Sequence, residues 1–212
     1  MAGYPKDYEK PEEKKDFKSD YMKISKEGDR KIRILRSPII GFETWENVTG
    51  DDGKTRSKPN RARTFQEAVN LPSKDGKVKE FHAFVVWDYE TETIKLLTVT
   101  QKYRLEIYDY SIREEWGDLS GYDFVINRKG LTFEDTKYSI RPMPHKPMSK
   151  DIKDAYKEVT IKEELYFEGG HPIVREDSLA DDVANALGED KPKTNYENDM
   201  EDGIDISEDV PF

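Results

Sequence analysis

The feature that most restricts the fold is the pattern of residues 81–99. Residues 81–87 read FHAFVVW, a run of aromatic and β-branched side chains. Residues 88–92 are polar, and residues 94–100 then return as IKLLTVT. Two such runs around a short polar connection predict a β-hairpin, because branched and aromatic side chains pack well on a pleated surface.

A helix is expected directly after this hairpin. Thr100 can cap its first turn, and Leu105, Tyr108, Ile112 and Trp116 recur at helical spacing. We therefore expect these four side chains on the buried side and the helix end at Gly117. Residues 122–127 read YDFVIN and predict a third strand. The order strand, strand, helix, strand is that of the middle of a five-stranded OB-fold barrel.

The outer strands of such a barrel can also be placed. Residues 21–24 predict a short strand, and residues 31–36 alternate as a first barrel strand that continues past Pro38 to Trp45. Residues 136–141 predict the fifth strand, ended by the prolines of residues 142–147. Ser149 can cap an added C-terminal helix through Ile152, running on towards Phe167 and packing against the barrel or a second copy of the chain.

The predicted fold class is therefore mainly β. The OB-fold domain spans residues 21–175, with a helix between strands 3 and 4. Residues 1–20 predict a flexible charged arm and residues 176–212 a disordered acidic tail.

The acidic charge is concentrated at the C-terminus. Residues 176–212 hold 13 acidic and 2 basic side chains, a net charge of −11. Subtracting this from the total of −10 leaves +1 for residues 1–175. The overall charge therefore does not exclude nucleic-acid binding by the body of the chain.

The longest expected loop, residues 46–79, carries the most basic segment. Basic side chains occupy half of the ten positions from 54 to 63, with no acidic residue among them: Lys54, Arg56, Lys58, Arg61 and Arg63. Single-stranded DNA is bound by cations that contact phosphates and by rings that stack on bases. The candidate stacking rings are Trp45, Phe65, Phe84 and Trp87, each of which has burial in the core as its alternative role. Arg33, Lys95, Arg128 and Arg141 are further candidates for the same groove.

Catalysis, cofactors and membranes receive no support from the sequence. The chain has no cysteine and only three scattered histidines, which argues against a zinc site. No motif for nucleophilic or metal-dependent hydrolysis is present, so we expect a protein that is not an enzyme and needs no cofactor. No apolar run reaches membrane length. These features predict a cytoplasmic protein, in the host cytoplasm if the chain is viral.

The last residues form a candidate protein-docking peptide. Asp209, Val210, Pro211 and Phe212 end the chain as an apolar tip after many acids. A partner can bind the terminal ring and carboxylate in a basic pocket.

This tip resembles the Asp-Ile-Pro-Phe ending of bacterial single-stranded DNA-binding proteins, which implies recruitment of replication and repair enzymes. The body resembles single-stranded DNA-binding proteins of tailed phages in residues 27–35, 84–87, 121–124 and 136–138. The chain departs from these groups in lacking a Cys/His zinc site and a Gly/Gln/Pro-rich linker.

The sequence thus predicts a protein that coats and protects single-stranded DNA without sequence preference in phage replication, recombination and repair. Two alternatives stay open within binding proteins: an RNA-binding OB protein, and a DNA-mimicking inhibitor of a host enzyme. A metal-dependent nuclease ranks behind both.

Overall fold

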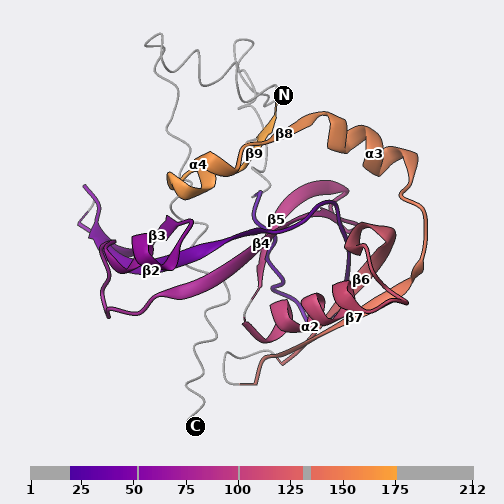
Figure 1. Cartoon of the computed structure of the whole chain (residues 1–212), viewed down its shortest axis with the longest axis horizontal. Coiled ribbons are helices and arrows are strands. Elements are labelled where there is room, and N and C mark those ends of the chain that lie inside the picture. Colours follow the sequence, from indigo (N-terminus) through magenta and orange to yellow (C-terminus); the bar gives the residue numbers. More distant parts are fainter. Residues whose placement is uncertain (1–19, 52, 100, 131–134, 176–212) are drawn as a thin grey trace, which may run out of the picture.

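The computed structural model describes residues 20–51, 53–99, 101–130 and 135–175. It is mainly β, with an antiparallel sheet, as the sequence predicted (Figure 1). Its strands are β1 (Gly28–Ile34), β2 (Ile39–Thr49), β3 (Thr55–Ala62), β4 (Lys79–Asp88), β5 (Thr93–Val99), β6 (Tyr122–Lys129), β7 (Lys137–His145), β8 (Val159–Ile161) and β9 (Ile173–Arg175). Its helices are α1 (Phe65–Val69), α2 (Gln101–Ile112), the 3-10 turn η1 (Leu119–Gly121), α3 (Lys150–Lys157) and α4 (Glu163–Phe167).

Strand β4 is the centre of the main sheet. The seven strands run in the order β3-β2-β4-β1-β6-β7, and β5 pairs with the other edge of β4. One half of β4 pairs with β2, with Ala83 opposite Ile39, and the other half pairs with β1, with Trp87 opposite Arg33. The hairpin predicted at residues 81–99 is confirmed, because β5 follows β4 antiparallel with Leu97 opposite Phe84.

The sheet has an apolar core on each face. Alternate residues of β4 point to opposite faces, so Phe84 and Val86 join one cluster with Ile107 of α2. Val85 and Trp87 join a second cluster with Ile152 of α3 and Tyr166 of α4. Helices α2 and α4 accordingly lie on opposite sides of the sheet (Figure 1).

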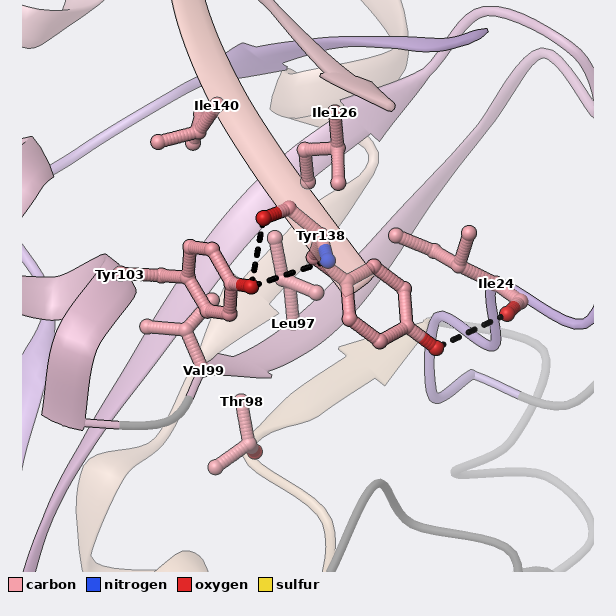
Figure 2. Close-up of a pocket in the computed structure, with 8 residues that line it drawn as sticks. All are labelled: Ile24, Leu97, Thr98, Val99, Tyr103, Ile126, Tyr138 and Ile140. Carbon is pink, nitrogen blue, oxygen red and sulfur yellow. Dashed lines mark hydrogen bonds between the residues drawn. The ribbon is translucent and has the colours of Figure 1, made fainter. Parts of the chain in front are cut away.

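The barrel is not closed by strand pairing. Among the described residues no ladder joins β5 to β7, and a seam between them is lined by apolar side chains around a cavity of about 30 Å³ (Figure 2). The seam is bridged by side chains and by residues 20–24, which we call the strap. In the strap, the N–H of Met22 donates to the carbonyl of Leu96 at 2.8 Å, and the carbonyl of Ile24 accepts from Arg128 at 3.0 Å. The predicted closed, five-stranded barrel is therefore replaced by an open sheet with a strapped seam.

Helix α2 turns a different side to the core from the one predicted. Leu105, Tyr108 and Ile112 are 51%, 56% and 63% exposed, whereas Ile107 is buried. The fourth predicted residue, Trp116, does pack against the core, but it lies beyond the helix, which ends at Ile112 instead of Gly117. The packed stripe is instead Tyr103, Ile107 and Tyr110, which also has helical spacing. Both stripes contain apolar side chains, so the sequence pattern alone does not show which one is buried. The position of α2 over the seam determines that the stripe with Ile107 faces the core.

Two further expectations are wrong in detail. Strand β7 runs through Pro142 and Pro144 because it lies at the edge of the sheet, where a missing N–H breaks no ladder. The C-terminal helix, capped at Ser149 as predicted, ends at Lys157 instead of approaching Phe167. Residues 159–175 then form the β8–β9 pair with α4 between its strands.

Candidate nucleic-acid interface

The basic segment predicted as a loop forms one strand of a long hairpin. Residues 42–49 of β2 pair with residues 55–62 of β3, from Phe42 opposite Ala62 to Thr49 opposite Thr55. Gly53 supplies the positive φ of +73° that the tight turn requires. Pro59 is tolerated because β3 is the edge strand of the sheet. In Figure 1 this β2–β3 hairpin extends away from the other strands.

Because it is a strand, the segment divides its cations between two faces. Residues directly opposite in an antiparallel pair share a face, so Arg56 lies beside Val48 and Lys58 beside Glu46. We call this side, which also carries Phe42, the hairpin face. Arg61 pairs with Glu43 on the other side. The predicted cluster of five cations is therefore not one surface.

Arg61 and Arg63 pack against α4. The guanidinium of Arg61 lies 3.9 Å from the ring centroid of Tyr166, and its side chain is only 5% exposed. Its Nε is 3.6 Å from a carboxylate oxygen of Glu43, whose pKa burial raises even though Arg61 opposes the shift. Arg63 is half exposed and lies over Phe167, 3.4 Å from Glu164. Arg61 is therefore a structural residue, and its assignment to the DNA groove is corrected.

The four predicted stacking rings occupy different environments. Phe84 and Trp87 are 1% and 7% exposed, so they belong to the two cores and present no open ring face on which a base could stack. Trp45 lies on the face opposite the hairpin face, where its indole N–H donates to Glu43 at 3.1 Å. Phe65, at 49% exposure, packs edge-on against Phe42 at 5.8 Å and extends the hairpin face.

Two of the additional cations are buried. Arg33 is 1% exposed; its Nε donates to Asp123 at 2.5 Å, and its Nη atoms donate to the carbonyls of Ser120 and Lys146. Burial alone would raise the pKa of Asp123, but hydrogen bonds from Lys31, Arg33 and Tyr89 outweigh it and lower that pKa. Lys95 is 8% exposed, with its Nζ 3.6 Å from the Asp88 carboxylate. Neither side chain is accessible to DNA, because both charges take part in ion pairs inside the fold, so their assignment to the groove is corrected.

The other two cations stabilise the far end of the sheet. Arg128 donates to Ile24 of the strap and to Thr136 at 3.3 Å. Arg141 is 60% exposed and pairs with Asp29 at 2.9 Å. Neither lies with Arg56 and Lys58, so the single groove that the sequence predicted for all these cations is not formed.

Sequence reasoning missed a groove between α2 and the sheet. It encloses about 510 Å³ and contains the exposed Ile40 and Tyr108 together with Arg36 and Arg104 at its edges. Ile40 is two residues before Phe42 on β2, so it lies on the hairpin face and connects that face to the groove. The signal in the sequence was the alternation of Ile40, Phe42 and Val48. Because residues after Trp45 were expected to form a loop, Val48 was not recognised as part of the same strand face.

Other kinds of site receive little support. The part of the chain that the structure describes holds no group of three His, Cys, Asp or Glu side chains arranged to bind a metal. Within the same residues, none of the helices has the length and apolar character needed to cross a membrane. The predicted docking tip, residues 209–212, lies outside the described residues.

The chain was also compared with known proteins. No family model, no curated protein and no solved structure matches it.

Proposed function

We propose that this protein binds single-stranded DNA without sequence preference, coating and protecting it. The observation that carries this proposal is the composition of the hairpin face. Arg56 lies there opposite Val48 and Lys58 opposite Glu46, and the half-exposed Phe65 packs on Phe42 at its base. Cations next to accessible rings are the combination that single-strand binding requires.

The order of the elements supports the same reading. Taken together, β1 and β2 correspond to one long bent first strand, followed by β4, β5, α2, β6 and β7, which is the element order of an OB-fold. OB-folds bind oligonucleotides on the face of their second and third strands and on the loops beside it. Here the outward face of β4 and β5 is covered by α3 and α4. In this proposal the DNA lies on the connection after the first barrel strand, where β3 pairs with the outer part of β2 to form the β2–β3 hairpin.

The cellular role follows from the resemblance of the sequence to phage single-stranded DNA-binding proteins. In this proposal the protein acts in phage replication, recombination and repair. The tip at Asp209–Phe212 recruits the partner enzymes, and the acidic tail competes with DNA for the cations of the body.

Titration of labelled oligo-dT, oligo-U and duplex DNA at several salt concentrations tests the proposal. We expect tight binding to oligo-dT, weaker binding to the duplex, and a log–log salt slope of about −0.7 per phosphate neutralised. Equal or tighter binding to oligo-U would favour the RNA-binding alternative. If the protein bound none of the three ligands, the proposal would be refuted and the DNA mimic favoured. Degradation of oligo-dT on adding Mg²⁺ would favour a nuclease.

Deletion of residues 189–212 tests the role of the tail. The truncated protein should bind oligo-dT more tightly, because a tethered anion no longer occupies its cationic surface. Unchanged affinity would refute the competition, without affecting the proposal that the body binds DNA.

A further inference from the structure

We propose that the groove between α2 and the sheet receives a base of the bound single strand, with Tyr108 as its stacking platform. This inference rests on the proposed function, and it assigns a subsite and a residue to it. Tyr108 is 56% exposed on α2 and lines the groove, so a large part of its side chain is accessible to a ligand.

The floor of the groove suits an aromatic ligand. Phe84 and Ile107 line it, both 1% exposed, and Ile40 of β2 lines it with half of its surface accessible. A volume of about 510 Å³ falls within the range of roughly 300–1,000 Å³ typical of small-ligand sites. A flat apolar ring can therefore enter without rearrangement of the core.

The edges of the groove suit a phosphate. Arg36 is held by Glu163 of α4, and Arg104 by the carbonyl of Glu80 at 3.0 Å and its carboxylate at 3.2 Å. These contacts fix the two guanidinium groups in place. Arg36, whose side chain is 30% exposed, keeps N–H donors for a phosphate oxygen after its bond to Glu163 is made. Arg104 is only 11% exposed, so its main role is to hold Glu80.

The cations farther out on the same side of the β2–β3 hairpin favour nucleic acid over a protein partner. Ile40 and Phe42 lie on one side of β2, Phe65 packs on Phe42, and Arg56 and Lys58 follow farther out. From Ile40 to Val48 the strand extends about 26 Å, at roughly 3.3 Å per residue. Between the groove and the outer cations, Thr44 and Asn60 both donate to the carbonyl of Pro72, at 2.7 and 3.2 Å, so the chain at Pro72 covers this part of the face. A flexible single strand with a base in the groove can pass over this segment to reach Lys58.

Substitution of Tyr108 tests the inference in the full chain. Tyr108→Ala should weaken binding to oligo-dT roughly five- to hundredfold, the range expected for losing one stacked base. Tyr108→Phe keeps the ring and should bind like the wild type. Leu105→Ala is the matched control, because Leu105 is 51% exposed on the same helix but does not line the groove, and it should leave affinity unchanged.

An abasic oligonucleotide of the same length separates stacking from other effects. It offers phosphates without bases, so the wild type and Tyr108→Ala should bind it equally. Equal loss on both ligands would overturn the inference, as would an unchanged oligo-dT affinity in Tyr108→Ala, which would leave the groove to a protein partner. Failure of the wild type to bind oligo-dT at all would instead refute the proposed function before any variant is made.

Tyr108→Trp provides a second readout that does not depend on affinity. Its indole emission should be quenched by oligo-dT and not by the abasic strand. Thermal unfolding shows whether each variant is folded. Because position 108 is exposed, substitutions there should change stability little. A Tyr108→Trp protein that binds oligo-dT without any quenching difference between the two ligands would contradict stacking at this position.

Discussion

The hydroxyl of Tyr103 makes two hydrogen bonds to the backbone of Tyr138. It donates to the carbonyl oxygen at 2.7 Å and accepts from the N–H at 3.1 Å (Figure 2). In a paired sheet, a neighbouring strand would form hydrogen bonds with the same N–H and C=O groups. One side chain of α2 therefore replaces one pair of the backbone hydrogen bonds that are missing between β5 and β7.

Replacing Tyr103 with Phe should therefore destabilise the protein. The ring stays packed against Tyr138, but two backbone groups lose their partner, at a cost of about 1–3 kcal/mol in the free energy of unfolding. Urea denaturation measures this loss. Tyr108→Phe removes an equivalent hydroxyl from an exposed side chain and should change stability by less than about 0.5 kcal/mol. Equal stabilities of the two variants would contradict the role given to Tyr103.

Asp123 should be important for stability at neutral pH and unimportant in acid. Its side chain is buried and binds Arg33 and Lys31, at 2.5 and 2.7 Å. Asp123→Asn leaves Arg33 buried without its counter-charge, so we expect a loss of about 3–5 kcal/mol at pH 7. Denaturation curves at neutral pH measure it.

The pH dependence gives a second check on the same residue. The folded state lowers the pKa of Asp123, so its contribution is present above the unfolded pKa of about 3.9 and is lost as pH falls through the lower folded pKa. The stability difference between the wild type and Asp123→Asn should therefore shrink in this acidic range. A constant difference from pH 7 to pH 2 would show that charge is not the cause.

His171 should make the protein less stable in mild acid. Burial lowers the pKa of His171; Asp20 opposes the shift, while Arg175 and Arg61 add to it. Its ring packs edge-on against Tyr21 of the strap at 4.7 Å. The unfolded chain takes up a proton near pH 6.5 and the folded chain only below this, so stability is lost as pH falls from about 6.5.

Urea denaturation at pH 7.5 and 5.5 isolates this effect. His171→Gln should lose less stability over the interval than the wild type. His145→Gln provides a control, since it removes a histidine that stacks on Trp116 instead of packing against the strap. An identical pH response in the wild type and in His171→Gln would exclude His171 as its source.

Lys58 should contribute to DNA binding through its charge alone. It is exposed on the hairpin face, so Lys58→Gln should weaken oligo-dT binding and reduce the log–log salt slope by about 0.7. Lys153→Gln removes an exposed charge from α3 and should leave the slope unchanged. Salt titrations of both variants measure the two slopes. Equal salt slopes for the two variants would show that the hairpin face does not contact DNA.

The sequence predicted the core strands well because their patterns are locally complete. Residues 81–99 combine β-branched side chains with a polar turn, and the structure pairs them as expected. Ile32 and Ile34 alternate with Arg33 and Leu35, and the two pairs face opposite sides of β1. In such segments local propensity and tertiary packing agree.

The functional surface was harder to predict because it depends on pairing between distant residues. The segment 54–63 contains Pro59 and few apolar residues, so it has no strand pattern of its own, and only pairing with β2 makes it a strand. Pairing in turn separates Arg61 from Lys58. Trp87 and Phe84 are a second example. The alternation of side chains along a strand shows that the two rings lie on opposite faces of the sheet, but it does not show that helices cover both faces.

The ion pair between Asp20 and Arg175 joins the first and last residues that the structure describes. A short peptide bridging these positions should therefore close the chain into a ring without distorting the sheet. New ends could then be opened at the turn around Gly53, which makes the fold a candidate for circular permutation. For the same reason, a reporter fused before residue 20 and another fused after residue 175 would start as neighbours, an arrangement suited to energy-transfer measurements of unfolding.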